Sequence, residues 1–392
     1  MGNPAGQFSA RKGHTVMEDK DTKSRPVSTE LPLRDAVAIA GRFTAKANLI
    51  PVLSCVLIMP DGMIAATNSS RRAEIQTDAR IAAPICVDAA NLAKALGKSG
   101  SYDITVDGMT LVVERGKTRS VIAGLPHDEF PEAPALIGGQ TEFEIDAANF
   151  VGACETAGGF ASRIDARYYL CGAHVEISNK IHIVATDGHR LFWQELDRAD
   201  AYEPTDPDRT GIIPTEMLAI MRGAFGKSDT LSVKISDREI RVEAGASTIS
   251  SVLIEGAYPD WRRIISMGGE GIEFHCDSDE MAEALAAVSW ACGREGDATI
   301  ARIAIDPDAI IASAWSVSGS ADSAESGISH AAPPVTDGDG FQFLCNFKYM
   351  SEICAAYKGV IVKVTSSGKS CPLKIVSAGV PGRTCILMPV RG

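Results

Sequence analysis

The chain of 392 residues is long enough for two or three domains, and its 45% apolar and 22% charged residues are ordinary for a folded globular protein. No run approaches the roughly 18 apolar residues needed to cross a bilayer, and the first 29 residues lack the apolar segment of a signal peptide. The net charge of −12 argues against a protein that is basic over its whole surface. We therefore expect a cytoplasmic protein without a membrane partner, whose residues 1–29 form a disordered tail.

A short pattern near the start of the chain occurs twice. The segment Asp88 to Leu92 returns roughly 60 positions later as Asp146 to Phe150. In each copy a short β-like run precedes an aspartate that suits a helix N-cap, and helix-spaced apolar residues follow it. Looser copies begin near Leu31, Ile213, Cys276 and Cys345, so the sequence predicts six repeated units.

Alternating or β-branched runs with turn signals lie between the predicted helices. They include residues 102–106, 110–114, 180–185, 231–235, 239–243 and 360–364. A unit with one helix and a few antiparallel strands is too small to bury both faces of its sheet, so we expect the units to pair into domains of about 120 residues. The predicted fold class is α+β, with three similar domains that span residues 30–138, 139–268 and 269–392.

One segment of the third predicted domain has an unusual composition. Residues 316–340 are rich in Ser, Gly, Ala, Asp and Pro, unlike the strand-like sequence on either side. Such a composition favours a mobile surface loop, and we expect this segment to have no catalytic role.

The cysteines and histidines give little indication of a metal centre. The ten cysteines are scattered without a CxxC pair, and many lie in apolar runs, so buried free thiols are expected in preference to disulfides. Pairing of adjacent strands could bring His174, His182 and His189 together, but no HExxH or zinc-finger spacing accompanies them. We expect no metal and no other cofactor.

The most informative local stretch is Ile183 to Leu191. It reads as a buried strand that enters a tight Asp-Gly turn, followed by a cationic and then an apolar side chain. Such a turn can form the floor of a pocket. An enzyme would use Asp187 and His189 as an acid-base pair, but no nucleophile elbow, phosphate loop or metal motif accompanies them. We therefore expect a protein that is not an enzyme.

The residues Thr186 to Leu191, which read TDGHRL after a β-strand, resemble the signature of the bacterial DNA polymerase III beta subunit, the sliding clamp. Three further segments are similar to that family. They are Arg167 to Leu170 (RYYL), Tyr258 to Ile264 (YPDWRRI) and Leu387 to Arg391 (LMPVR). The resemblance covers the chain from about Leu31 to its last residue.

The resemblance implies an assembly and a function. Members of this family are head-to-tail homodimers whose twelve helices line a closed ring around double-stranded DNA. The chain would then be a processivity factor in DNA replication, with the DNA polymerase III alpha subunit, other polymerases, repair proteins and the clamp loader as partners. Topology holds such a ring on DNA, so weak phosphate contacts suffice and an acidic exterior is compatible with the function.

The resemblance also implies a pocket that receives a short linear motif from these partners. Its apolar members would form a cleft for leucine and phenylalanine anchors, with methionine adapting to several partners, and its charged members would orient the peptide. One site that serves many proteins in turn calls for affinity of about 1 μM. The implied residues are Leu170, Thr186, Gly188, His189, Arg190, Leu191, Pro259, Arg263, Ile264, Pro372, Met388, Pro389, Val390 and Arg391.

The implied DNA contacts are less complete than in the family. Thr215 and Glu216 follow Pro214, where the family commonly has a basic residue, and Ala47 stands where the family has an arginine. The candidates that remain for DNA binding are Lys46, Arg167, Tyr168 and Tyr169.

The helical segments nevertheless carry many cations. If all six helices line one surface, that surface could be basic on an otherwise acidic body, although ordinary solvated helix faces explain the same residues equally well. These cations are Arg34, Arg42, Lys46, Lys94, Lys98, Arg163, Arg167, Arg222, Lys227, Lys348 and Lys358.

The dimer interface implied by the resemblance involves the strand from Thr118 to Gly124. It has Ser120 where an aromatic residue is expected and keeps Val121 and Ile122 as its bulky apolar residues, so we expect a less stable dimer. The missing basic and aromatic positions keep a second hypothesis open. The chain could be a specialised clamp paralogue that acts as an interaction scaffold without efficient encirclement of DNA.

Overall fold

The structure is a computed structural model that describes residues 30–46, 50–133, 140–200, 208–267, 271–291, 300–306, 309–315, 323–335 and 341–390. The predicted tail of residues 1–29 lies outside the described residues. None of the helices in these ranges is long and apolar enough to cross a membrane.

Three successive parts of the chain have similar elements. The first contains α1 (Leu33–Ala40), η1 (Pro51–Ser54), β1 (Cys55–Ile58), β2 (Met63–Thr67), β3 (Arg71–Gln76), β4 (Ile85–Asp88), α2 (Ala89–Leu96), β5 (Asp103–Asp107), β6 (Thr110–Arg115), β7 (Thr118–Leu125) and η2 (His127–Glu129). The second contains β8 (Thr141–Asp146), α3 (Ala147–Phe160), η3 (Asp165–Leu170), β9 (Gly172–Ile177), β10 (Lys180–Thr186), β11 (Arg190–Asp197), β12 (Arg209–Pro214), α4 (Thr215–Phe225), β13 (Thr230–Ile235), β14 (Glu239–Ala244), β15 (Ser247–Val252) and α5 (Trp261–Ile265). The third contains β16 (Ile272–Asp277), α6 (Ser278–Val288), η4 (Ser289–Ala291), β17 (Ile300–Ile305), β18 (Ile310–Trp315), β19 (Ser323–Ile328), β20 (His330–Val335), β21 (Phe341–Asn346), α7 (Phe347–Ala356), β22 (Ile361–Ser366), β23 (Leu373–Val376) and β24 (Arg383–Leu387).

The helices begin where the repeated pattern predicts them. Asp88 and Asp146 each accept a hydrogen bond of 2.8 Å from the backbone amide three residues later, which caps α2 and α3. Asp277 and Asn346 cap α6 and α7 in the same way. The predicted unit of strand, capping residue and helix is therefore confirmed for these four helices, and α1 and α4 lie in the other two predicted units.

The strands form sheets that continue from one part of the chain into the next. An eleven-stranded sheet has the order β5-β6-β7-β4-β1-β2-β3-β15-β14-β13-β8, and a nine-stranded sheet has the order β12-β9-β10-β11-β24-β23-β22-β16-β20. The pairings β3 with β15 and β11 with β24 join strands that are far apart in the sequence. A four-stranded sheet, β19-β18-β17-β21, completes the third part.

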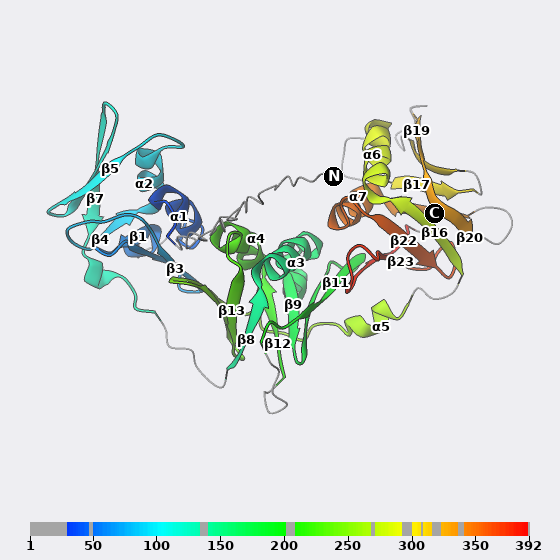
Figure 1. Ribbon diagram of the computed structural model, residues 1–392, viewed down its shortest axis with the longest axis horizontal. Helices are drawn as coiled ribbons and strands as arrows, with labels where there is room; N and C mark the ends of the chain where they lie inside the picture. Colours follow the sequence, from blue (N-terminus) through cyan, green and yellow to red (C-terminus); the bar gives the residue numbers. More distant parts are fainter. Residues whose placement is uncertain are drawn as a thin grey trace, which may run out of the picture.

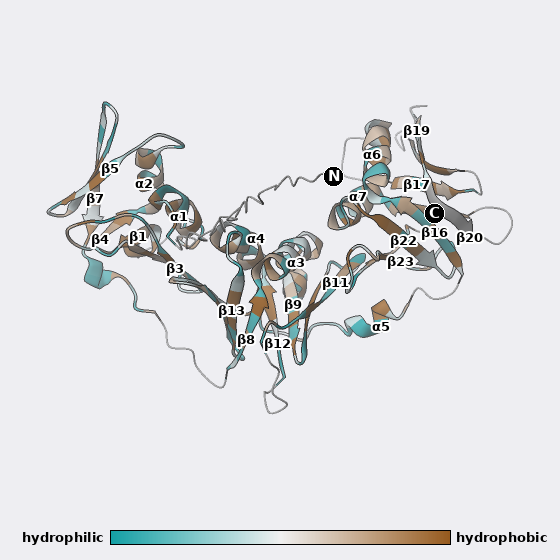
Figure 2. Cartoon of the chain, viewed as in Figure 1, coloured by the Kyte–Doolittle hydropathy of each residue, from teal (hydrophilic) through white to brown (hydrophobic). Residues whose placement is uncertain are grey.

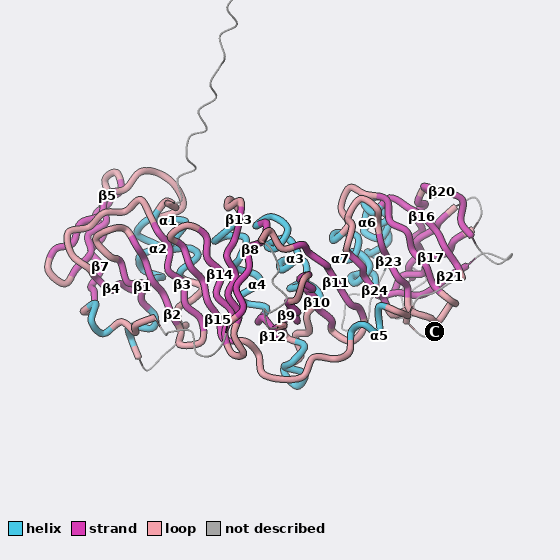
Figure 3. Tube along the Cα trace, turned by 60° about the horizontal axis from the view of Figure 1, so that its bottom comes forward, coloured by secondary structure: helices cyan, strands magenta, loops and turns pink. Residues whose placement is uncertain are grey.

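These continuous sheets give the molecule the shape of a crescent. The helices α2, α1, α4, α3, α7 and α6 follow one another along its concave side, and the strands lie on the convex side (Figure 1). The turned view shows the strands as a band with the helices behind them (Figure 3). Figure 2 shows brown, hydrophobic residues in strands such as β13 and β22, whereas the helices carry both hydrophilic and hydrophobic residues. One extended cluster of buried apolar side chains fills the space between the helices and the sheets.

The interpretation of residues 316–340 as a mobile loop was wrong for residues 323–335. This stretch forms β19, which pairs with β18, and β20, which pairs with β16. Both are edge strands in the described sheets, and an edge strand needs few large apolar residues and tolerates proline, so composition alone did not reveal them. Residues 316–322 and 336–340 lie outside the described residues.

The expected free thiols are confirmed among the described residues. Nine cysteines are unpaired, and seven of these are buried. Burial raises the pKa of the Cys86 and Cys276 thiols to about 12, so both are protonated and unreactive at neutral pH. Cys292 lies outside the described residues.

Candidate functional site

The Asp-Gly turn between β10 and β11 is held by its own side chains. Thr186 Oγ1 accepts a hydrogen bond of 3.0 Å from the Gly188 amide, and Gly188 has φ of +91°, which favours glycine. Asp187 accepts hydrogen bonds from the backbone amides of residues 189 and 190, at 2.9 and 3.2 Å. The carboxylate therefore stabilises the turn, and this geometry does not support the alternative in which Asp187 and His189 act as an acid-base pair.

Arg190 connects this turn to the third part of the chain. Its side chain is only 5% exposed and forms ion pairs with Asp187 and with Glu352 of α7. It also donates a hydrogen bond of 2.7 Å to the carbonyl of Gly159 at the end of α3.

Two aromatic rings complete the surroundings of this arginine. The guanidinium carbon lies 4.6 Å from the ring centre of Phe160 and 4.4 Å from that of Tyr349. The neighbouring His189 ring stacks on Tyr349 with ring centres 6.2 Å apart. Because Phe160 belongs to α3 and Tyr349 to α7, the turn is anchored on both sides of the junction.

A small apolar cavity of about 190 Å³ opens beside this turn. Its floor comes from β10 and β11, one wall comes from β24, and the opposite wall comes from the segment that contains α5. The lining residues are Leu170, Thr186, Gly188, Arg190, Leu191, Tyr258, Pro259, Trp261, Ile264, Ile386 and Met388. A cavity with this lining suits apolar side chains of a ligand.

The structure brings together eight of the fourteen residues predicted for the pocket. These are Leu170, Thr186, Gly188, Arg190, Leu191, Pro259, Ile264 and Met388. The loop that follows β24 crosses beside the turn, because the amide of Met388 donates a hydrogen bond of 2.9 Å to the carbonyl of His189.

The other described residues predicted for the pocket do not line the cavity. His189 is on the turn, Arg263 is on α5 and Pro372 directly precedes β23. Pro389 and Val390 follow β24, and the amide of Val390 donates to the carbonyl of Leu344. Arg391 lies outside the described residues.

Sequence reasoning did not assign three residues that line the cavity. Tyr258 and Trp261 are part of the YPDWRRI segment, so the signal for them was present in the sequence. Ile386 precedes Met388 by two positions, and side chains at this spacing on a strand share one face. The alternation of β24 could therefore have identified it.

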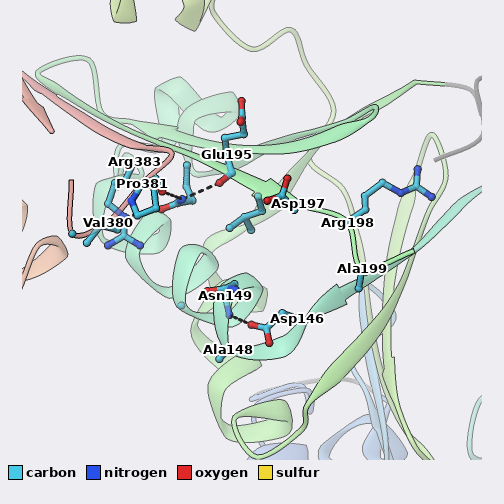
Figure 4. Close-up of a pocket in the computed structure, with 14 residues that line it drawn as sticks. Asp146, Ala148, Asn149, Glu195, Asp197, Arg198, Ala199, Val380, Pro381 and Arg383 are labelled. Carbon is cyan, nitrogen blue, oxygen red and sulfur yellow. Dashed lines mark hydrogen bonds between the residues drawn. The ribbon is translucent and has the colours of Figure 1, made fainter. Parts of the chain in front are cut away.

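A second, more polar groove lies at the other end of β11 (Figure 4). It has a volume of about 510 Å³ and lies between the first turn of α3 and the turn that joins β23 to β24. Gln194 accepts a hydrogen bond of 2.8 Å from Arg383 and donates to the carbonyls of Glu195 and Pro381. These contacts make the groove part of the same junction, and it contains none of the predicted site residues.

Comparison with known proteins shows a consistent similarity to bacterial sliding clamps. A profile of the central domain of the DNA polymerase III beta subunit matches residues 147–260. The beta sliding clamp of Caulobacter vibrioides is 25% identical over 364 residues, which cover 88% of this chain and 93% of that protein. The beta sliding clamp of Pseudomonas aeruginosa is 28% identical over 258 residues, which cover 62% of this chain and 68% of that protein. The chain is therefore similar to beta sliding clamps over most of its length.

Solved sliding clamps share this fold. The clamp from Bacillus subtilis superimposes with a TM-score of 0.79 at 19% identity, over 92% of this chain and 97% of that one. The clamp from Caulobacter crescentus superimposes with a TM-score of 0.73 at 25% identity, again over 92% and 97%. The predicted resemblance to the beta sliding clamp family, the α+β class with three similar clamp domains and the non-catalytic character are therefore confirmed.

The predicted DNA-binding residues lie in two places. Arg167, Tyr168 and Tyr169 are in η3, which leads directly to the pocket residue Leu170. Tyr168 is 55% exposed, and its ring contacts that of Tyr169 edge to face at 5.8 Å. Lys46 is exposed in the loop after α1, in a different domain.

Most of the predicted basic residues on and beside the helices are exposed. Arg42, Lys46, Lys94, Lys98, Arg163, Arg222, Lys227, Lys348 and Lys358 are exposed, whereas Arg34 and Arg167 are partly buried. The helix α6 differs, because it carries three acidic residues, Asp279, Glu280 and Glu283, and no lysine or arginine. The helices therefore differ in the charges they carry, and α6 is acidic.

We expect Arg190→Met to lower the free energy of unfolding by about 3 kcal/mol, because the variant leaves the Asp187 carboxylate buried without its ion pair. Arg222→Met is the matched control. It removes an exposed pair with Glu155, which we expect to cost less than about 1 kcal/mol. Denaturant unfolding of both variants measures the difference, and equal effects would contradict the structural role assigned to Arg190.

Proposed function

We propose that this protein is a DNA sliding clamp, a processivity factor that encircles duplex DNA and tethers DNA polymerase and repair proteins through the cavity beside the Asp-Gly turn. The observation that carries the proposal is the convergence of the turn, the α5 segment and the end of β24 on one apolar cavity in a chain similar to beta sliding clamps. The proposed partners are double-stranded DNA, the DNA polymerase III alpha subunit, other polymerases, the clamp loader and a second copy of the chain. The proposed compartment is the cytoplasm, where a bacterial clamp meets chromosomal DNA.

The cavity supports the proposed peptide site by its size and chemistry. A volume of about 190 Å³ accommodates one or two large apolar side chains, and the lining residues are mainly apolar. Met388 is 42% exposed at the rim, so it can move to fit different ligands. A small contact of this kind supports affinity of about 1 μM, which allows one partner to replace another.

The peptide site is tested with a fluorescein-labelled peptide of the Gln-X-X-Leu-Phe type in an anisotropy titration. We expect saturable binding near 1 μM, weakened about tenfold by Met388→Ala and abolished by removal of residues 388–392. Met267→Ala is the matched control, because Met267 is 37% exposed, follows α5 and does not line the cavity. Failure of the intact protein to bind the peptide would contradict the proposed site.

The two ends of the crescent support a head-to-tail dimer. The strand β7 lies at one end and β19 at the other (Figure 1). Among the described strands β19 pairs with β18 alone, and β7 pairs with β4 only at Gly124 and Leu125, so both present unpaired backbone groups. Of the two predicted interface residues, Val121 is 54% exposed, whereas Ile122 is 7% exposed and contributes to the core of its own domain.

Trp290 adds an apolar anchor at the second end. It lies in η4 after α6 and is 66% exposed, whereas its neighbours Val288 and Ala291 are buried against Ala314. Large exposed aromatic residues are typical of protein interfaces. We infer that Trp290 contacts the β7 end of a second copy, which compensates for the small side chain of Ser120.

We expect the wild-type protein to be a dimer at micromolar concentration and Trp290→Asp to be mainly monomeric, because a charge at the interface is desolvated without a partner. Ile361→Asp is the matched control, since Ile361 is 52% exposed on β22 and lies at neither end. Sedimentation velocity measures the mass. A wild-type mass near one protomer, or equal masses for the two variants, would contradict the interface.

A second candidate function rests on the acidic residues of the concave side. The three carboxylates of α6, together with Thr215 and Glu216 at the start of α4, would repel phosphate groups or fail to bind them. A specialised paralogue that acts as a scaffold for peptide partners, without efficient encirclement of DNA, is the alternative that these residues favour.

A further inference from the structure

The α5 wall of the cavity is held in place by an aromatic cluster on the outer face of the nine-stranded sheet. The Trp261 ring lies 5.6 Å from the His182 ring and 6.1 Å from the Trp193 ring, centre to centre. The His182 and Trp193 rings lie 6.0 Å apart, and Trp193 Nε1 donates a hydrogen bond of 3.3 Å to His182 Nδ1. Trp261 lines the cavity, whereas His182 and Trp193 do not.

Two further contacts attach the same segment to β9. The Tyr258 ring stacks on the His174 ring with centres 4.9 Å apart and planes inclined by 11°. Arg262 forms a bidentate ion pair with Glu176, with N to O distances of 2.9 and 2.5 Å. The segment carries no strand that pairs with the sheet, so these side-chain contacts and the buried face of α5 determine its position in the described structure.

We propose that His182 and Trp193 are positioning residues that fix Trp261 against the sheet and thereby set the affinity of the cavity for its ligand. The inference rests on the proposed peptide site, and it names two residues that touch no part of the cavity. If Trp261 moves away from Trp193, the α5 wall moves with it and the cavity loses one of its three sides.

The cluster depends on the neutral form of histidine. His182 Nδ1 accepts a hydrogen bond from Trp193 Nε1, and a protonated imidazole has no acceptor, so protonation breaks this hydrogen bond. Burial lowers the pKa of His182, an effect that Glu176 and Glu195 oppose and that Arg262 and Lys180 reinforce. Burial also lowers the pKa of His174, with Glu176 opposing and Arg262 reinforcing the shift.

The sign of the pH effect follows from these lowered pKa values. The packed segment binds fewer protons than the released one, in which the histidines return toward their ordinary pKa of about 6.5. The packed state is therefore favoured above about pH 6.5 and loses stability as the pH falls below that value. The affinity of the cavity should decrease in the same pH range.

Limited trypsin digestion tests the position of the wall without any ligand, because Arg262 and Arg263 lie on α5. We expect Trp193→Ala to accelerate cleavage after these arginines about tenfold, and Trp193→Phe, which keeps an aromatic ring, to restore slow cleavage. Lys180→Ala is the matched control, since Lys180 is on the same face of β10 as His182 and pairs with Asp197.

The same variants are then titrated with the Gln-X-X-Leu-Phe peptide. We expect Trp193→Ala to weaken binding about tenfold and Trp193→Phe and Lys180→Ala to leave it near the wild-type value. Between pH 7.5 and 5.5 we expect the wild-type affinity to fall several-fold, and His182→Gln to reduce this dependence, because glutamine does not titrate.

The outcomes separate the inference from the proposed function. Wild-type binding with unchanged cleavage and unchanged affinity in Trp193→Ala would overturn the inference alone. If the affinity falls by the same factor between the two pH values in the wild type and in His182→Gln, the role of His182 is overturned. Faster cleavage in Trp193→Ala without any peptide binding by the wild type would refute the peptide site, and with it the effect on affinity.

Discussion

Pairing of β11 with β24 is the interaction on which the crescent and the cavity depend. Five residue pairs, from Arg190 with Leu387 to Gln194 with Arg383, join strands that are almost 200 positions apart in the sequence. At the start of β11 the ion pairs of Arg190 tie the junction together, and at its other end Gln194 and Arg383 do the same. A junction held at both ends keeps the helices of the second and third domains on one concave surface.

The same pairing creates the apolar cavity as a consequence of the architecture. The turn before β11 and the loop after β24 meet because the two strands are neighbours, and the α5 segment closes the third side on its way to the next domain. A site built from three chain segments at a domain junction has its floor fixed by the sheet. Its outer wall rests on side chains alone. We therefore expect the aromatic cluster beneath Trp261 to influence the cavity more than residues equally far from it on the sheet.

Local features of the structure could be predicted from the sequence, and contacts between distant segments could not. Capping residues such as Asp146 have short-range signals and mark helix starts correctly. The TDGHRL signature located the turn, because the residues that form the turn are neighbours in the sequence. The contact of His182 with Trp261 and the burial of Ile122 required knowledge of which segments pack together. The edge strand β19 lacks the large apolar residues by which strands are recognised.

Retention on DNA tests most directly whether this clamp encircles its substrate. The protein is loaded by the clamp loader of its host onto nicked circular duplex DNA, and the complex is separated from free protein by gel filtration. One half of the sample is first cut once with a restriction enzyme. A closed ring predicts that the protein stays with the circle and leaves the linear molecule by sliding off its ends. Equal retention on circular and linear DNA, or no retention on the circle, would contradict encirclement and favour the scaffold function.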